Sequence, residues 1–189
     1  SAIRACSEKG ILFIQGHGAI VRNFITGVGN FAGTGRGIYL IQSPDVLFKD
    51  NLIVGSQTGL AIERGSDARI ENNLISLCPY FGITVTSSSP TITRNNITQN
   101  EFGIFLAGGS RPKVKDNNIF ENASLDIKVA DYWNLKPGEQ AVDLDMSGNW
   151  WGRNGLDVIY DHIEDGTDNP TLGARVVIEP VRKDAVQVE

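Results

Sequence analysis

Apolar residues along this chain recur in a fixed relation to asparagine. One apolar side chain lies three residues before an Asn, and another lies two residues after it. The central residues of this frame are Asn23, Asn51, Asn73, Asn95 and Asn117, at spacings of 28, 22, 22 and 22 residues. Three equal spacings with matching flanks indicate an internal repeat, and such a repeat is the structural unit of a stacked fold.

A second pattern runs in phase with the first. Gly37, Gly59, Gly82 and Gly103 each open an apolar-x-apolar triplet, and 13 or 14 residues separate each glycine from the next Asn of the frame. Alternation with a period of two predicts a strand with one buried face. Each repeat therefore contains at least two short strands joined by turns.

A repeat of 22 residues is compatible with a leucine-rich repeat or with one coil of a β-helix. The Leu-x-x-Leu-x-Leu frame is absent, and Ile, Val and Thr dominate the strands. We therefore predict an all-β fold, a single-stranded parallel β-helix of five to six coils. Coils stacked at about 4.8 Å give a rod of about 25–30 Å. The coils occupy residues 1–152, and residues 153–189 form a C-terminal cap and tail.

Stacking explains the asparagines, because residues one period apart lie directly above one another. A column of Asn side chains passes amide hydrogen bonds from coil to coil. Asn also tolerates the left-handed backbone conformation that the turns require, so we expect the column residues to adopt it. The frame recurs once more at Met146, Asn149 and Trp151, which predicts Asn149 as a sixth rung.

Two insertions and the chain ends depart from the repeat. Residues 28–36 contain Phe31, and residues 131–140 contain Tyr132 and Trp133, three aromatic side chains suited to anchoring a partner. Within the repeat, Phe81 and Phe102 each precede a repeat glycine, and we expect them to stack on each other.

The chain after Gly152 predicts a cap. Val158, Ile159 and Ile163 form one apolar face of a short helix, and Val176 to Ile178 form a strand that Pro180 ends. Ser1 to Gly10 is too short to cover the first coil, and open coils expose strand edges. We therefore expect either that the chain is a fragment or that another protein subunit covers its N-terminal end.

Composition excludes several classes of protein. Hydrophobic residues are 41% and charged residues 21%, as in ordinary folded domains. A net charge of -5 and a pI near 5.1 offer no basic surface for nucleic acid. No apolar run approaches 18 residues, so no transmembrane segment is predicted. The 21 Gly and 15 Asn suit a fold with many tight turns.

Candidate catalytic residues are few. Glycoside hydrolysis needs two carboxyl groups about 5–10 Å apart, yet Glu63 is the only carboxylate among ten outward positions after the repeat glycines. The best acidic group is Asp126, Asp131, Asp143 and Asp145, with Arg111 or Lys128 as a basic partner. These oxygens could hold Ca²⁺. The alternative, which we favour, is a solvated acidic end with no catalytic role and no metal or other cofactor.

Other catalytic and metal motifs are missing. His17 and His162 are the only histidines, and neither an H-E-x-x-H nor a Gly-x-Ser-x-Gly motif occurs. Cys6 and Cys78 have no evident catalytic partner. Two interpretations stay open for these cysteines: they are buried thiols, or they form a disulfide in an exported protein.

The repeated Gly-Ile-x-Leu and Asn-Asn-x-Ile frames over residues 10 to 182 resemble right-handed parallel β-helix proteins of the NosD-like type, also called the CASH domain. The ending Asn149-Trp150-Trp151-Gly152, followed by Ile159-Tyr160-Asp161, resembles the terminus of many such bacterial proteins. The resemblance implies an extracellular or periplasmic location. It also implies a function among periplasmic accessory proteins, surface proteins, polysaccharide lyases, hydrolases and epimerases.

Three functions remain as hypotheses. The regular repeat without an acid–base constellation favours a non-catalytic structural or binding module, which presents a rigid face and the two insertion loops to a partner protein or a polysaccharide. The first alternative is a polysaccharide lyase, epimerase or glycoside hydrolase that acts on acidic glycans. The second is a periplasmic accessory factor like NosD, although two His and one Met argue against direct metal handling.

Overall fold

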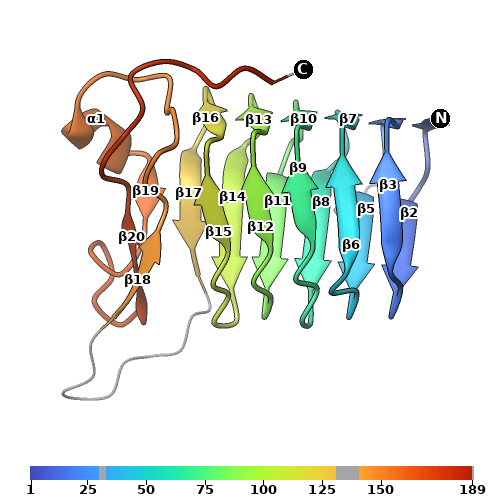
Figure 1. Ribbon diagram of the computed structural model, residues 1–189, viewed down its shortest axis with the longest axis horizontal. Helices are drawn as coiled ribbons and strands as arrows, with labels where there is room; N and C mark the ends of the chain where they lie inside the picture. The colour runs from blue at the N-terminus through green and yellow to red at the C-terminus, as the bar shows by residue number, and fades with distance from the viewer. Residues whose placement is uncertain (30–32, 131–140, 189) are drawn as a thin grey trace.

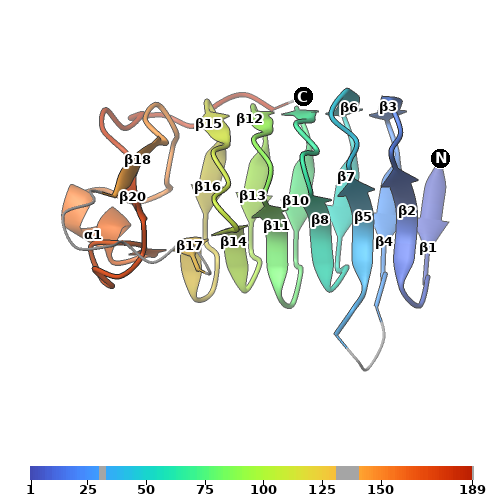
Figure 2. The same ribbon diagram turned by 90° about the horizontal axis from the view of Figure 1, so that it is seen from below.

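The computed structural model describes residues 1–29, 33–130 and 141–188. The chain winds into a stack of coils, and each regular coil contributes one strand to each of three parallel sheets (Figure 1). The view from below shows the same stack with strands of successive coils side by side (Figure 2). The all-β parallel β-helix predicted from the repeat is confirmed.

The three sheets differ in length, and each coil visits them in the order A, B, C. Sheet A contains β1 (Ala2–Arg4), β4 (Phe24–Thr26), β7 (Leu52–Val54), β10 (Leu74–Ser76), β13 (Asn96–Thr98) and β16 (Asn118–Phe120). Sheet B contains β2 (Lys9–Ile14), β5 (Arg36–Ile41), β8 (Thr58–Glu63), β11 (Phe81–Thr86), β14 (Phe102–Ala107), β17 (Leu125–Val129) and β19 (Ile163–Glu164). Sheet C contains β3 (Gly18–Val21), β6 (Val46–Lys49), β9 (Arg69–Glu71), β12 (Thr91–Thr93) and β15 (Lys113–Lys115).

The register between coils follows the sequence period and builds the core. Ile53, Ile75 and Ile97 are aligned in sheet A, and all three are fully buried. Sheets B and C supply equivalent buried columns that include Leu60 and Ile70. Burying one aliphatic side chain contributes about 1.5–3 kcal/mol, so these three columns are the main source of stability.

The repeat glycines are explained by close approach between coils. A Cβ atom added to Gly37 or Gly59 would lie 2.6 Å from the carbonyl oxygen of the equivalent residue in the next coil. A Cβ on Gly103 would lie 2.5 Å from the carbonyl oxygen of Asp126. Only glycine fits where coils approach this closely.

The predicted asparagine column is confirmed. The backbone N–H of Asn51 donates to Oδ1 of Asn73 at 2.8 Å, and that of Asn73 donates to Oδ1 of Asn95 at 2.9 Å. The column continues through Asn117 to Asn149, whose Oδ1 accepts the Asn117 backbone N–H at 2.9 Å. Asn149 is thus the sixth rung.

The backbone conformation at this corner corrects one expectation. The left-handed residue is the one that precedes each ladder Asn, not the Asn itself. Non-glycine residues with φ of 54–56° form this column: Arg22, Asp50, Asn72, Arg94 and Asp116. This geometry turns the following Asn inward, where its amide bridges two coils.

Two further ladders, which the repeat pattern did not predict, line the other corners. Between sheets A and B, Oδ1 of Asn100 accepts from Cys78 N–H, and Oδ1 of Asn122 accepts from Asn100 N–H, both at 3.1 Å. Between sheets B and C, serine hydroxyl oxygens accept backbone N–H groups of the preceding coil. This serine ladder consists of Ser43, Ser66, Ser88 and Ser110.

The C-terminal cap is partly as predicted. Helix α1 (Leu156–Tyr160) contains Val158 and Ile159, but Ile163 lies in β19, which pairs with β17 in sheet B. The expected helical face that includes Ile163 is therefore wrong. β18 (Val142–Asp145) and β20 (Ala174–Val177) form a two-stranded parallel sheet. The boundary at residue 152 stays a prediction.

Two ends of the chain shape the surface. β1, β2 and β3 are the terminal strands of their sheets, and a subunit that covers them stays a prediction. At the other end, residues 182–188 leave the cap and run back along the rod past β16 and β13 towards β10 (Figure 1, Figure 2).

Candidate functional site

A polar groove follows the corner between sheets C and A. We call it the corner groove; its volume is about 700 Å³. Its lining residues are Arg22, Lys49, Asp50, Glu71, Asn72, Thr93, Arg94, Asp116 and Gln187. All except Gln187 come from the repeat, at the same corner of successive coils.

The repeat itself positions these side chains. The left-handed residue of each corner contributes one member, because its neighbour, the ladder Asn, takes the inward position. The last residue of the preceding sheet C strand contributes another, since it alternates with a buried core residue. Equivalent groups therefore recur at about 4.8 Å along the rod.

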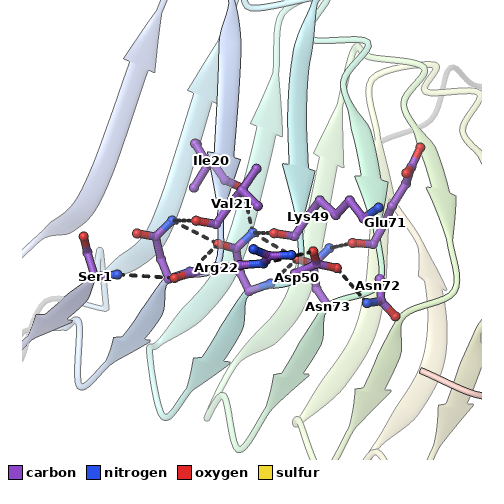
Figure 3. A network of polar contacts seen from close by, with 11 residues as sticks. Ser1, Ile20, Val21, Arg22, Lys49, Asp50, Glu71, Asn72 and Asn73 are labelled. Carbon is purple, nitrogen blue, oxygen red and sulfur yellow. Dashed lines mark hydrogen bonds and ion pairs between the residues drawn. The ribbon is translucent and has the colours of Figure 1, made fainter. Parts of the chain in front are cut away.

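The corner side chains form a polar network (Figure 3). Nδ2 of Asn72 donates to Oδ1 of Asp50 at 2.7 Å, and Nε of Arg22 lies 3.8 Å from Oδ2 of Asp50. The amino group of Ser1 donates to the carbonyl oxygen of Arg22 at 3.3 Å. Acidic, basic and amide groups therefore alternate along the corner and hold one another in place.

The same corner has a more apolar side towards sheet A. A second cavity of about 500 Å³ shares Arg22, Asp50 and Asn72 with the corner groove. It is also lined by Phe24, Leu52 and Leu74, the first residues of three sheet A strands, and by Val188 of the C-terminal segment. A polar strip with an apolar edge therefore extends along several coils.

Asp126, the first acidic candidate, is buried. It occupies the sheet B position that glycine holds in earlier coils, beside Gly103. Oδ1 of Asp126 accepts from Asn122 Nδ2 at 2.7 Å, and Oδ2 lies 3.5 Å from Arg153 Nε. Burial raises the pKa of the Asp126 carboxyl, although Asn122 and Arg153 oppose this shift. This geometry indicates a structural role for Asp126, which links the last coil to the cap inside the protein.

Arg153 extends this set of contacts to a histidine. Its Nη2 lies 3.2 Å from Nδ1 of His162, and the carbonyl oxygen of His162 accepts the backbone N–H of Asp126 at 2.8 Å. Since arginine carries only donors, Nδ1 of His162 accepts this hydrogen bond. The cluster joins β17, the loop before α1 and the segment before β19.

Asp143 and Asp145 lie elsewhere, on the outward side of β18. Arg175 binds Asp143 through two hydrogen bonds of 3.0 Å, and Lys115 lies 2.8 Å from Oδ2 of Asp145. Hydrogen bonds from Lys115 and Ser147 lower the pKa of Asp145 to about 2. Asp126 and the Asp143–Asp145 pair thus belong to separate ion-pair systems.

The remaining acidic and basic candidates are dispersed. Asp131 lies outside the described residues. Lys128 pairs with Glu164 at 3.1 Å, and the backbone N–H of Arg111 donates to Ser88 at a turn. Within residues 1–29, 33–130 and 141–188, no group of three or more His, Cys, Asp or Glu side chains could hold a metal ion.

The predicted binding aromatics Phe31, Tyr132 and Trp133 also lie outside the described residues, so their role stays a prediction. The expected stacking of Phe81 on Phe102 is confirmed, with ring centroids 5.3 Å apart. Cys6 and Cys78 are both free thiols, and burial raises the pKa of Cys78 to about 12. Cys78 is therefore an unreactive, buried thiol in the ladder between sheets A and B.

Comparison with protein families identifies the fold. The sequence model described as "Right handed beta helix region" matches residues 1–136. The chain belongs to this right-handed β-helix family. The match spans the coils up to β17 and ends before β18, so the expected right-handed winding is confirmed for the repeat region.

Other comparisons add no functional information about this β-helix protein. A search of curated proteins and a search of solved structures each gave no match. In the part of the chain that the structure describes, no helix is long and apolar enough to cross a lipid bilayer.

The sequence shows outward side chains of mixed charge at this corner, among them Lys49, Glu71 and Arg94, but mixed charge by itself predicts a solvated face with weak cross-strand pairs and not a groove. The residues before the ladder asparagines are Arg22, Asp50, Asn72, Arg94 and Asp116, a column of charged and amide side chains at the repeat spacing. The contribution of Gln187 had no signal in the repeat.

Proposed function

We propose that this β-helix protein is a non-catalytic binding module that holds a neutral polysaccharide chain along the corner groove. The observation that carries the proposal is a single groove of about 700 Å³ lined by equivalent polar side chains of five successive coils. A polymer with repeated hydroxyl groups can meet a repeated set of partners at each coil.

The balance of charge supports a neutral ligand. Arg22, Lys49 and Arg94 oppose Asp50, Glu71 and Asp116 in the groove lining. Carboxylates accept hydrogen bonds from sugar hydroxyl groups, and guanidinium groups donate to them. A polyanion or polycation would gain from one set of side chains and be repelled by the other.

The state of the acidic candidates supports a non-catalytic role. A glycosidase needs a protonated carboxyl group that reaches the leaving oxygen. The pKa of Asp126 is raised, but its side chain is fully buried. Asp145 is exposed, but its low pKa keeps it ionised. Neither Asp126 nor Asp145 combines protonation with access.

The location belongs to the same proposal. We place the protein outside the cytoplasm, as a NosD-like β-helix protein of the extracellular space or periplasm. The support is the resemblance of the Asn149-Trp150-Trp151-Gly152 ending and its repeat frames to exported proteins of that type.

The test compares two arginines of the same face. Arg94 lines the groove, whereas Arg69 lies on β9 outside its lining. Titration with soluble xylan, mannan and β-glucan should show binding to at least one polymer. Arg94→Ala should weaken that binding about tenfold, since a charge-assisted hydrogen bond contributes about 1.5–3 kcal/mol. Arg69→Ala should leave it unchanged.

Three results would contradict the proposal: no binding to any neutral polymer, equal effects of the two substitutions, or release of products from a polymer. Polygalacturonate, tested with and without Ca²⁺, serves as the acidic comparison. Turnover of this polymer would favour the lyase or hydrolase instead.

A further inference from the structure

The segment 182–188 is fastened to the corner by a small set of specific contacts. Nη1 of Arg182 donates to Oδ1 of Asp116 at 2.6 Å, and the backbone N–H of Arg182 donates to the carbonyl oxygen of Asn149 at 3.0 Å. The Asn118 amide binds both backbone groups of Val186, at 2.7 Å and 2.8 Å. Asn118 thus pairs with this segment as a neighbouring strand would.

The last residues of this segment lie over the site. Gln187 lines the corner groove, and Val188 lines the adjoining cavity on the sheet A side. Successive residues therefore reach the two sides of the corner, as alternate side chains of an extended segment do. Asp116, one end of the groove lining, is already occupied by Arg182.

The segment nevertheless buries few of its side chains. Residues 182–185 and Gln187 are exposed, and only Val186 and Val188 are partly buried. Segments with few buried apolar contacts open at low free energy compared with global unfolding. The segment can therefore leave the corner while the coils stay folded.

We propose that residues 182–188 form a strap that occupies one end of the corner groove and limits access to it. This inference rests on the proposed function and adds its regulation. A short oligosaccharide fits the open part of the groove beside Arg22 and Asp50. A long polymer reaches Asp116 only after the strap is displaced. Its apparent affinity is therefore proportional to the fraction of molecules in which the strap is open.

The test uses the full chain with the strap released. Arg182→Ala removes the ion pair with Asp116, and Val186→Pro removes the N–H group that Asn118 binds. The control is Lys183→Ala with Ala185→Pro. It removes the same charge and adds the same proline at exposed positions for which the described structure shows no hydrogen bond. Thermal midpoints of both double variants verify that the coils are folded.

The first measurement does not depend on a glycan. Thr93 lines the groove together with Gln187, so a Thr93→Cys substitution reports access to it. In a Cys6→Ser background, a bulky maleimide should alkylate this cysteine at least fivefold faster when the strap is released. The control should react at the rate of the unmodified strap. Equal rates for the released and control variants would overturn the strap.

The second measurement uses the neutral polymer found by titration and its short oligosaccharides. Strap release should raise the affinity for the polymer about fivefold and leave the affinity for the short oligosaccharides unchanged. Unchanged polymer affinity in the released variant would overturn the strap while the proposed function stands. Absence of any glycan binding would overturn the proposed function, and the alkylation rates would still decide whether the strap controls access.

Discussion

Individual residues at the corners of the coils adopt a strained backbone conformation, and hydrogen bonds made by the residues next to them offset its cost. Thirteen non-glycine residues of the described chain have positive φ, and they recur at the corners of successive coils. An L-residue in this conformation costs about 1–2 kcal/mol. At nine of these thirteen positions the next residue is Asn or Ser, and within the stack its side chain satisfies buried backbone groups of a neighbouring coil, which explains why the conformation persists there.

Leu77 offers a direct test of that cost. It adopts φ of 55° and is 55% exposed, while the equivalent corner positions in two earlier coils are Gly27 and Gly55. Leu77→Gly should stabilise the protein by about 0.5–1 kcal/mol, because relief of the left-handed strain exceeds the entropy that glycine adds to the unfolded chain. Urea unfolding measures the change.

A matched control for this prediction is Leu12→Gly, which replaces another exposed leucine, but within β2. Glycine in a strand should cost about 0.5–1 kcal/mol. If both substitutions destabilise the protein equally, strain at Leu77 is not the determining factor.

Asn95 tests the ladder. Its buried amide accepts from Asn73 N–H at 2.9 Å and donates to the carbonyl oxygen of Ile70 at 2.9 Å. Asn95→Ala leaves these buried groups without partners and should cost about 3 kcal/mol in the free energy of unfolding. Asn96→Ala, at the partly exposed neighbouring position, should cost about 1 kcal/mol. Similar losses for the two variants would argue against a structural ladder.

Residue roles could be predicted only in part from the sequence. The spacing of Asn51, Asn73 and Asn95 identified the ladder, because only stacking explains a fixed period. In the pair Asn72-Asn73, however, composition gives no reason to assign the left-handed conformation to the first residue. The hydrogen bonds between coils determine the assignment, because a left-handed conformation at Asn72 turns Asn73 inward, where its amide reaches the neighbouring coils.

Strands of the coils were predictable because they repeat, whereas elements of the cap occur once. The spacing of Ile159 and Ile163 is typical of a helix, yet Ile163 pairs with β17. The open edge of β17 offers backbone hydrogen-bonding groups that a helical continuation would leave unpaired. The helix therefore ends at Tyr160, with Ile159 as its only buried residue.

The pairing of Lys115 on β15 with Asp145 on β18 links the last coil to the two-stranded sheet and predicts a pH dependence. The pKa of Asp145 is about 2 in the folded protein, below the value of about 3.9 for a free side chain. Its contribution to stability is therefore present above about pH 4 and is lost as the pH falls towards 2.

Asp145→Asn should accordingly destabilise the protein at neutral pH, with the difference from the original chain vanishing near pH 2. Urea unfolding between pH 2 and pH 7 measures this difference, which should shrink in high salt because the pair is exposed. Asp45→Asn, at an exposed turn position, is the control. A constant difference across the pH range would show that the ion pair is not its cause.

The molecule as a whole presents a site that no single repeat contains. The corner groove results from stacking equivalent residues, and its occupied end results from a segment about 70 residues away from Asn118 in the sequence. The repeat period predicts which residues share a column. It does not predict the path of residues 182–188, which depends on the cap and on individual contacts such as that of Arg182 with Asp116.

We propose that the corner of the rod between sheets C and A is the binding surface. Mapping of backbone amide chemical shifts during titration with the bound neutral polysaccharide tests it most directly. The largest changes should follow the corner through Asp50, Asn72 and Arg94 and include the strap. Changes confined to the outer face of sheet B, around Tyr39 and Phe105, would contradict the account.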